Sequence, residues 1–459
     1  MSLSEYKYPS KYGKPYKHQE TTVEFLVQNP RSFVLSGLGS GKTLSCMWAA
    51  DYLRIVGKIK KVLVIAPLSC VYSVWGDSIF NHQPYRKFSY LTGSKEKRLK
   101  ALKDEAFYYV INHDGIKVIE DELIKAKFDL VIIDEVTAYA THTSQRSKSA
   151  ARICKAAKGV WSLTGTPTAN SPLSAFGIAR VTRPNNPDLP KSFYVYRDKV
   201  CQTWDGFSWE PKEGCEKDVA KVLSPSIKFR TDECIDLPDT IYMDRDVQLS
   251  DEVMKLYTKM KKEMLIEMEQ GLVTAVNAAS KMTKLLQITA GGVIDADGQV
   301  LDIDCSQKIE EILSLWDENE QIPAIISATY TASIHFIEKA LLAKKKRVAF
   351  IDSSKTGMAR ANIVKSFQNG ELDFLILQPK AASHGLNLQN SNLLIHFSPI
   401  MSNETHLQVN GRIIRSGQIR KQIVVNLAAS PTERRFYKAL KEKTNLQEII
   451  MAEFSAPMK

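Results

Sequence analysis

The sequence predicts an α/β protein built of two lobes, each a mostly parallel sheet flanked by helices. Short, continuous apolar runs alternate with helix-length amphipathic segments through both halves of the chain. Strands that are apolar throughout are typical of parallel sheets that helices cover on both faces. The runs form two series that lie far apart in the sequence, and this separation predicts two lobes.

Ten apolar runs carry this prediction. They cover residues 32–37, 61–67, 108–112, 129–135 and 159–165 in the first half, and 323–329, 347–352, 373–378, 392–398 and 423–429 in the second. Residues 183–230 are rich in Pro, Trp, Phe and Tyr without a clear period, which predicts an irregular insertion on the first lobe. We therefore expect the first lobe at 1–235, a linker and helical segment at 236–300, and the second lobe at 301–459.

Composition narrows the class of partner. The chain has 459 residues, a net charge of +11 and an isoelectric point near 9.1. This excess of positive charge favours a polyanion such as a nucleic acid, although a merely basic surface explains it equally well.

The compartment is expected to be the cytoplasm. The seven cysteines form no CxxC pair, which fits a reducing environment and argues against a structural metal site. The first residues contain no apolar core of the kind a signal peptide needs, and no apolar run approaches the ~18 residues of a membrane span. We also expect the protein to act as a monomer.

A glycine-rich segment, "SGLGSGKT", follows the first apolar run and precedes a helical pattern. Glycines let the backbone curl so that its N–H groups face a phosphate, while the lysine reaches the β- and γ-phosphates and the threonine hydroxyl ligates magnesium. A serine stands where the full phosphate-loop pattern has its first glycine, and the alternative is a plain strand-to-helix turn. The predicted nucleotide-binding residues are Ser36, Gly37, Leu38, Gly39, Ser40, Gly41, Lys42 and Thr43.

Adjacent acids end another apolar run, "DLVIIDE". Asp134 is predicted to hold Mg²⁺, and Glu135 to polarise the attacking water as general base. Taken alone, two acids at the end of a strand are usually just solvated. Together with the glycine-rich loop they predict nucleotide hydrolysis.

The segment "WSLTGTPTAN" ends a third run. Thr164 and Thr166 there could sense the γ-phosphate, or the segment could be an ordinary turn.

Near the end of the chain, "QVNGRIIRSGQ" places Arg412 and Arg415 three residues apart, a spacing that puts both on one face of a helix. Arginines supplied from a second lobe stabilise the charge that develops on a transferred phosphoryl group. The alternative is a pair of surface salt bridges, which contribute little free energy.

In this order and spacing the motifs resemble those of superfamily 2 helicases, and in particular the Swi/Snf-type DNA translocases, including small members encoded by bacteriophages. The similar segments are "YKHQ", "SGLGSGKT", "VIAPLS", "DEVT" and "LTGTPTAN" in the first half, and "ISATYTAS", "PKAASHGLNLQ" and "QVNGRIIRSGQ" in the second. The resemblance covers nearly the whole chain and implies two RecA-like lobes that use ATP and Mg²⁺. The chain departs from the family in the "DEVT" motif, which more often ends in Ala-His or Gly-His.

The resemblance also implies roles for single residues. Gln19 would read adenine, and Asn387 would approach the ribose. The residues expected to face the triphosphate from the second lobe are Gln408, Arg412 and Arg415. Those expected to approach DNA phosphates are Ser69, Thr329, Arg360 and Lys380.

The N-terminal stretch interleaves Tyr6, Tyr8, Tyr12 and Tyr16 with lysines. These rings could stack on DNA bases. Packing on the first lobe, or stacking on adenine beside Gln19, is the favoured interpretation.

The expected function is that of an ATP-dependent DNA translocase or helicase that hydrolyses ATP between two lobes, in DNA replication, recombination or repair. Two alternatives stay open. One is a nucleotide-switched protein that clamps a partner without moving, and the other is an RNA helicase.

Overall fold

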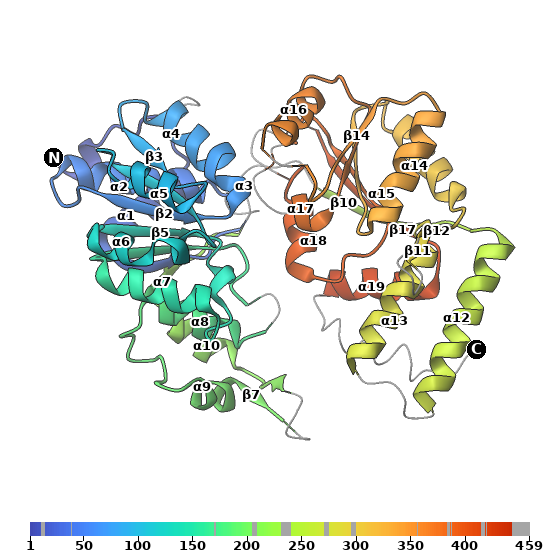
Figure 1. Ribbon diagram of the computed structural model, residues 1–459, viewed down its shortest axis with the longest axis horizontal. Coiled ribbons are helices and arrows are strands. Elements are labelled where there is room, and N and C mark those ends of the chain that lie inside the picture. The colour runs from blue at the N-terminus through green and yellow to red at the C-terminus, as the bar shows by residue number, and fades with distance from the viewer. Residues whose placement is uncertain are drawn as a thin grey trace. The chain divides into compact units, whose positions relative to one another are not determined.

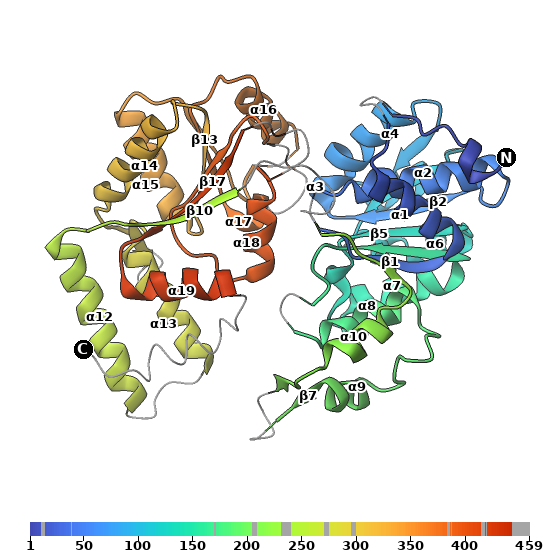
Figure 2. The same cartoon turned by 180° about the vertical axis from the view of Figure 1, so that it is seen from behind.

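The computed structural model divides the chain into two compact units, Met1–Asp236 and Leu237–Lys459, each with its own sheet and helices (Figures 1 and 2). The structure describes residues 1–10, 14–37, 39–168, 171–203, 209–230, 240–269, 275–294, 300–355, 357–382, 386, 388–414, 418 and 420–442.

The first unit is built on a seven-stranded sheet in the order β3-β4-β2-β5-β6-β1-β9, and every pair of neighbouring strands is parallel. The strands are β1 (Arg31–Val34), β2 (Val62–Ala66), β3 (Phe88–Tyr90), β4 (Tyr108–Asn112), β5 (Leu130–Asp134), β6 (Gly159–Leu163) and β9 (Ser226–Ile227). All five runs predicted in the first half form strands of this sheet. The two edge strands β3 and β9 were not predicted, because two or three residues are too few to show a pattern.

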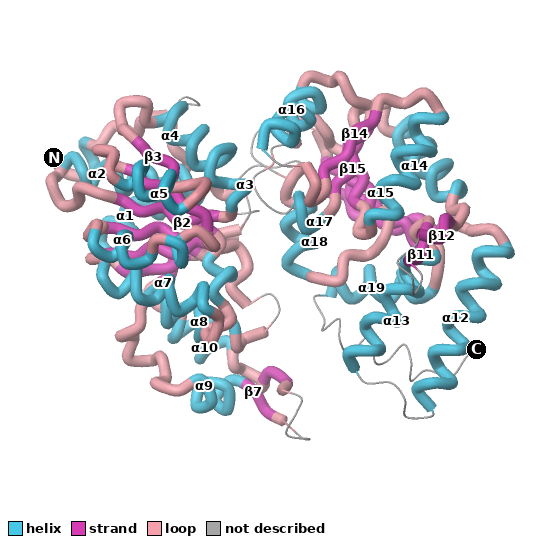
Figure 3. The backbone as a smooth tube through the Cα atoms, viewed as in Figure 1, coloured by secondary structure: helices cyan, strands magenta, loops and turns pink. Residues whose placement is uncertain are grey.

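Helices cover both faces of this sheet, as Figure 3 shows. Successive strand residues belong to different cores: Phe33 packs in one apolar cluster and Val34 in the other. This alternation explains why the strands are apolar throughout. The helices are α1 (Lys17–Gln28), α2 (Lys42–Ile55), α3 (Leu68–Cys70), α4 (Asp77–His82), α5 (Lys95–Leu102), α6 (Glu120–Lys125), α7 (Gln145–Ala156) and α8 (Ser174–Thr182).

The N-terminal arm packs on this unit. The Tyr6 hydroxyl donates a hydrogen bond of 2.8 Å to buried Asp51 on α2. The Tyr8 ring meets Trp48 edge to face at 5.3 Å, and the Trp48 indole donates to the Pro9 carbonyl at 2.7 Å. For the described part of the arm, packing on the first lobe is confirmed. Tyr12 lies outside the described residues.

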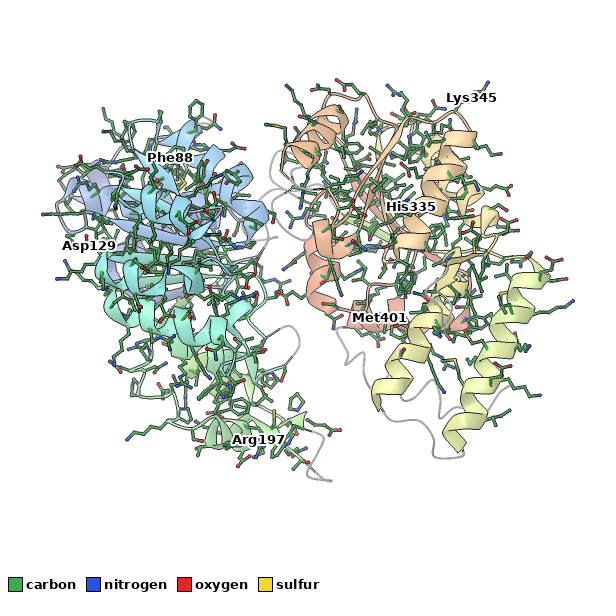
Figure 4. All side chains as sticks on the ribbon, viewed as in Figure 1. Phe88, Asp129, Arg197, His335, Lys345 and Met401 are labelled. Carbon is green, nitrogen blue, oxygen red and sulfur yellow. The ribbon has the colours of Figure 1, made fainter. Side chains whose placement is uncertain are left out.

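The insertion at 183–230 is more regular than predicted. It contains α9 (Phe193–Val200), the antiparallel pair β7 (Cys201–Gln202) and β8 (Glu210–Pro211), and α10 (Glu216–Val222). The Ser192 hydroxyl caps α9. The Arg197 guanidinium, labelled in Figure 4, lies 3.5 Å from the centre of the Trp209 ring and ties α9 to the β7–β8 pair. Tertiary contacts of this kind leave no periodic trace in the sequence.

The second unit holds a six-stranded sheet in the order β10-β17-β16-β13-β15-β14, again with only parallel neighbours. The strands are β10 (Thr240–Asp246), β13 (Ala324–Ser327), β14 (Val348–Ile351), β15 (Phe374–Leu377), β16 (Leu393–His396) and β17 (Gln422–Ala428). All five runs predicted in the second half are present. The edge strand β10 lies in the segment 236–300, which was predicted to be a linker and helical. The strand was not predicted because its sequence, "TIYMDRD", is too polar to be recognised as an apolar run.

The helices of this unit include two in that same segment, α12 (Asp251–Glu269) and α13 (Ala275–Ile288), followed by the short antiparallel pair β11 (Gly292–Ile294) and β12 (Val300–Asp302). The remaining helices are α14 (Ser306–Glu318), α15 (Thr331–Ala343), α16 (Gly357–Gln368), α17 (Pro379–Ala382), α18 (Asn403–Asn410) and α19 (Pro431–Glu442). Among the described residues of both units, no helix has the length and apolarity that crossing a membrane requires.

A fully buried ion pair joins helices α14 and α19 of the second unit. The Lys308 ammonium on α14 donates to Glu433 on α19 at 2.9 Å, and both side chains are 0% exposed. The same ammonium donates to the Phe397 carbonyl, and Glu433 also accepts from the Thr289 hydroxyl and the Ala429 backbone N–H. Because the carboxylate and ammonium meet several partners, the cost of burying the two charges is offset.

Two buried histidines lie beside this network. His396 at the end of β16 and His406 on α18 both hydrogen-bond the side chain of Asn410, at 2.8 and 3.1 Å. Burial lowers the pKa of His396 to about 4, and burial together with the neighbouring His396 lowers the pKa of His406 to about 3. Both imidazoles are therefore neutral at pH 7, and protonation would place charge in the interior.

The second unit should accordingly lose stability in acid. Between pH ~6.5 and ~4 the unfolded chain binds protons at these histidines and the folded chain does not, so each contributes a loss of about 1.4 kcal/mol per pH unit as the pH falls. Calorimetric unfolding between pH 7 and 4.5 measures this slope. In His406→Gln the side chain at position 406 cannot be protonated, so the loss of stability per pH unit should be smaller than in the wild type. His335→Gln should leave the slope unchanged, because the His335 side chain on α15 (Figure 4) is 58% exposed. Equal slopes for wild type and His406→Gln would contradict the assignment.

Candidate nucleotide site and associated motifs

Three predicted motifs of the first unit follow neighbouring strands of one parallel sheet. Strand β6 lies between β1 and β5, and Leu163 on β6 pairs with both Val34 and Asp134. The loop after β1, the acids that end β5 and the threonines after β6 must therefore meet at the same edge. The carboxyl ends of parallel strands are where ligands of open α/β sheets bind.

The loop after β1 has the backbone that a phosphate loop needs. Gly39 and Gly41 have φ of +77° and +74°, in the left-handed region that glycine adopts without strain. Gly41 is the N-cap of α2, so the loop leads straight into a helix N-terminus. The Lys42 ammonium bends back over the loop and donates to the carbonyls of Ser36 and Gly37, at 2.8 and 2.9 Å. Leu38 lies outside the described residues.

The serine that replaces the first glycine of the pattern has a structural partner. The Ser36 hydroxyl accepts a hydrogen bond of 3.1 Å from the backbone N–H of Phe229, and Gly37 donates its own N–H to the Phe229 carbonyl at 2.9 Å. A glycine at position 36 would lack the first contact. Residues 226–230, here called the strap, thus lie beside the loop and hydrogen-bond it. The sequence did not predict this contact.

Gln19 lies against the same loop. It is 6% exposed, its Oε1 accepts from the Tyr16 N–H at 2.9 Å, and a Cβ on Gly41 would lie 2.1 Å from its Nε2. The preceding His18 contacts the Ser40 carbonyl through Nε2 at 2.9 Å and stacks on the Tyr16 ring. The structure therefore brings Gln19 to the loop, while its recognition of adenine stays a prediction. His18 was missed.

Asp134 is held by a residue that the sequence did not single out. The indole N–H of Trp75 donates to Asp134 Oδ2 at 2.9 Å. Burial raises the pKa of Asp134, whereas the Trp75 hydrogen bond and the charge on Lys42 oppose that rise. The acid at the end of β5 and the lysine of the loop therefore lie close enough for their charges to interact.

Glu135 has an unusual backbone. Its φ of +54° and ψ of +63° are left-handed, a conformation that costs free energy in a residue other than glycine and that concentrates at functional sites. Its carboxylate accepts a long hydrogen bond of 3.4 Å from the Thr164 hydroxyl, which in turn accepts from the Thr166 N–H at 3.2 Å. The predicted base and the predicted γ-phosphate sensor are therefore in direct contact.

The residues present suit a magnesium ion. Mg²⁺ prefers oxygen ligands, and in nucleotide sites it takes one or two of them from the protein and the rest from phosphates and water. The carboxylate of Asp134 and the hydroxyl of Thr43 supply such oxygens, and Thr43 adjoins the lysine that interacts with Asp134.

Ser69 lies at the same edge of the sheet, in α3 directly after β2. It is half-buried, next to Leu68, which is 61% exposed. This position is compatible with the expected approach to DNA, which stays a prediction.

In the second unit, the motif near the end of the chain differs from its predicted form. Helix α18 ends at Asn410, so Arg412 lies in the turn that follows and the expectation that it lies on a helix is wrong. Arg412 is 4% exposed, and its guanidinium donates to the Leu386 carbonyl at 3.3 Å. Gln408, on α18, donates to Glu404 at 3.3 Å. Arg415 and Asn387 lie outside the described residues.

The three predicted DNA contacts of this unit follow three neighbouring strands. Thr329 follows β13 and donates to the Pro399 carbonyl at 3.3 Å. Lys380 follows β15, on α17, and is exposed, and Arg360 lies half-buried on α16, the helix after β14. Because β13, β15 and β14 are adjacent and parallel, these segments leave the sheet at one edge.

Known protein families match both units of the chain. The model of the SNF2-related domain family matches residues 18–290, and that of the helicase conserved C-terminal domain matches residues 307–417. A SWI2/SNF2 ATPase core of Sulfolobus solfataricus, solved in complex with dsDNA, superposes with a TM-score of 0.47 at 18% identity, over 99% of this chain and 96% of that one.

Curated relatives match along most of this chain. It is 27% identical to putative protein p41 of Acyrthosiphon pisum secondary endosymbiont phage 1, over 91% of this chain and 93% of p41. It is 26% identical to the uncharacterized ATP-dependent helicase MG018 of Mycoplasma genitalium, over 91% of this chain but 40% of that protein. With the RAD54-like DNA repair and recombination protein of Drosophila persimilis, it shares 23% identity over 90% of this chain and 60% of the relative. Since the SNF2-related model spans more than half of its residues, this chain belongs to the Swi/Snf-type, SNF2-related family of superfamily 2 helicases.

Proposed function

We propose that this protein is an ATP-dependent DNA translocase or helicase that hydrolyses ATP to ADP and phosphate and uses the reaction to move along DNA. One observation carries the proposal: Lys42, Asp134 and Glu135 meet at one edge of the first sheet, with Thr164 in contact with the general base. A protein that only bound nucleotide would not need Glu135.

The roles of these residues follow from their chemistry. Lys42 exchanges the loop carbonyls for the β- and γ-phosphates, and the N–H groups at the start of α2 face the same anion. Asp134 and Thr43 would hold Mg²⁺, which would neutralise charge on the phosphate oxygens. Glu135 orients a water molecule and accepts its proton as the water oxygen attacks the γ-phosphorus and ADP leaves. Thr164 fixes the Glu135 carboxylate.

The second unit is proposed to complete the reaction. In Swi/Snf-type proteins the residues that match Gln408, Arg412 and Arg415 face the triphosphate across the two lobes. A guanidinium brought there stabilises charge on the equatorial oxygens. Hydrolysis would then depend on the approach of the lobes, and this dependence would convert turnover into movement.

DNA is the proposed track. The net charge of +11 favours a polyanion, and the segments that carry Ser69, Thr329 and Lys380 leave their sheets at the carboxyl edges. Contacts to phosphates carry no sequence information, which suits a motor that must bind every step of its track. By analogy with relatives, we place the activity in replication, recombination or repair of a phage genome, carried out by a monomer in the host cytoplasm.

The first test is an ATPase assay over single-stranded, duplex, forked and four-way DNA, with RNA as comparison. We expect DNA to raise the rate and RNA to do so less. Lys42→Ala should abolish turnover because the phosphates lose their cation. Glu135→Gln should lower it by about 100-fold or more and retain ATP, because only proton transfer is lost. An ATPase rate that is flat across all DNA lengths and structures would refute the translocase.

The arginines require a separate experiment. Arg412→Lys and Arg415→Ala should lower kcat by about 1,000-fold, because a guanidinium in the transition state is worth that much, and should leave ATP and DNA binding largely intact. Arg434→Ala is the matched control, since Arg434 is exposed on α19 and pairs with Asp246. If a variant of Arg412 or Arg415 hydrolyses ATP at the wild-type rate, that arginine has a structural role and does not take part in hydrolysis.

A further inference from the structure

We propose that Trp75 is a positioning residue for Asp134, and that it links this magnesium-binding carboxylate to the surface segment 68–76. The inference rests on the proposed nucleotide site and adds a residue that its motifs do not include.

The contact itself is specific. The indole N–H of Trp75 donates to Asp134 Oδ2 at 2.9 Å, and the Trp75 side chain is 0% exposed within the core that covers one face of the sheet. A buried indole has two torsion angles, both held by packing, and a single donor. It can therefore fix one carboxylate oxygen and leave the rest of the acid for a metal ion.

The backbone around Trp75 is equally unusual. Residues Val71–Gly76 form a π-helical turn between α3 and α4, and such turns are rare and frequent at functional sites. The turn packs closely on β3: a Cβ on Gly76 would lie 1.9 Å from the Tyr90 hydroxyl, so any larger residue there would have to displace the Tyr90 side chain. The Tyr72 and Tyr90 rings lie 4.6 Å apart, and the Tyr72 hydroxyl is 2.6 Å from that of Thr92.

The same short segment reaches the surface. Leu68 and Tyr72 are 61% and 48% exposed, and Ser69 between them is a predicted DNA contact. A ligand that shifts this segment would shift the indole donor, and with it the orientation of Asp134. Trp75 thus connects the surface proposed to approach DNA with the carboxylate proposed to hold the metal.

The test is the binding of ADP measured by calorimetry, in Mg²⁺ and in EDTA. Trp75→Phe keeps an apolar ring and removes the donor. We expect its affinity for MgADP to fall by about tenfold, as when a partner that orients a metal ligand is lost, and its affinity for ADP in EDTA to stay at the wild-type value. Trp161→Phe is the matched control: Trp161 is also 0% exposed, but its indole donates to the Asn29 carbonyl, and both affinities should be unchanged.

Equal loss of ADP affinity in both buffers, or no loss in either, would overturn the assignment. So would a wild-type protein that binds ADP equally well with and without Mg²⁺. If Trp75→Phe does not fold, the proposal is tested on the folded wild type by recording the indole ¹H–¹⁵N resonances of its six tryptophans. A buried indole N–H that responds to Mg²⁺ in the ADP complex supports the proposal, and six unresponsive resonances refute it.

A kinetic measurement separates this inference from the proposed function. In the DNA-stimulated reaction, the Mg²⁺ concentration for half-maximal rate should rise about tenfold in Trp75→Phe, with the KM for MgATP at saturating Mg²⁺ little changed. If the wild type does not hydrolyse ATP but the MgADP difference persists, the proposed function fails while the role of Trp75 stands.

Discussion

The candidate site depends on one topological constraint: parallel neighbouring strands end at the same edge of a sheet. Strands β1, β6 and β5 are adjacent, so the glycine-rich loop, the threonines and the acid pair are delivered to one place although nearly 130 residues separate the first from the last. Nothing local to any one of these segments could bring them together. The apolar side chains of the strands, buried on both faces, fix the register and therefore the site.

Within this frame, each functional group is held by a specific hydrogen-bond partner. Lys42 is held by carbonyls of its own loop, Asp134 by the Trp75 indole, and Glu135 by the Thr164 hydroxyl. The loop is also hydrogen-bonded to the strap at 226–230, the last described residues before the chain enters the second unit. Three of these supports, the indole, the Thr164 hydroxyl and the strap, come from segments outside the glycine-rich loop and the acid pair. The indole and the strap therefore connect the candidate site to segments that lie outside its motifs.

The sequence was sufficient for the central strands of both sheets and for the loop and acids, because strands buried on both faces and turns that cradle phosphate have strong local signatures. It was insufficient where a residue acts through a distant partner. The Trp75–Asp134 contact joins elements 59 positions apart through a π-turn that no periodicity reveals. In the sequence alone, Ser36 is only a departure from the phosphate-loop pattern; its hydrogen bond with the Phe229 N–H is visible only in the structure. The edge strand β10 was missed because its sequence is polar, and the buried histidine pair because it meets through a distant partner. Helix α18 ends before Arg412, so that residue lies off the helix that its spacing suggested.

The central claim is that hydrolysis moves the protein along DNA, and displacement of the third strand of a triplex tests it most directly. A moving motor strips the third strand, whereas a nucleotide-switched clamp does not. We predict displacement by the wild-type protein with ATP, and none with ADP or by the Glu135→Gln variant. A third strand that stays bound while DNA stimulates ATP hydrolysis normally would contradict translocation and favour the clamp.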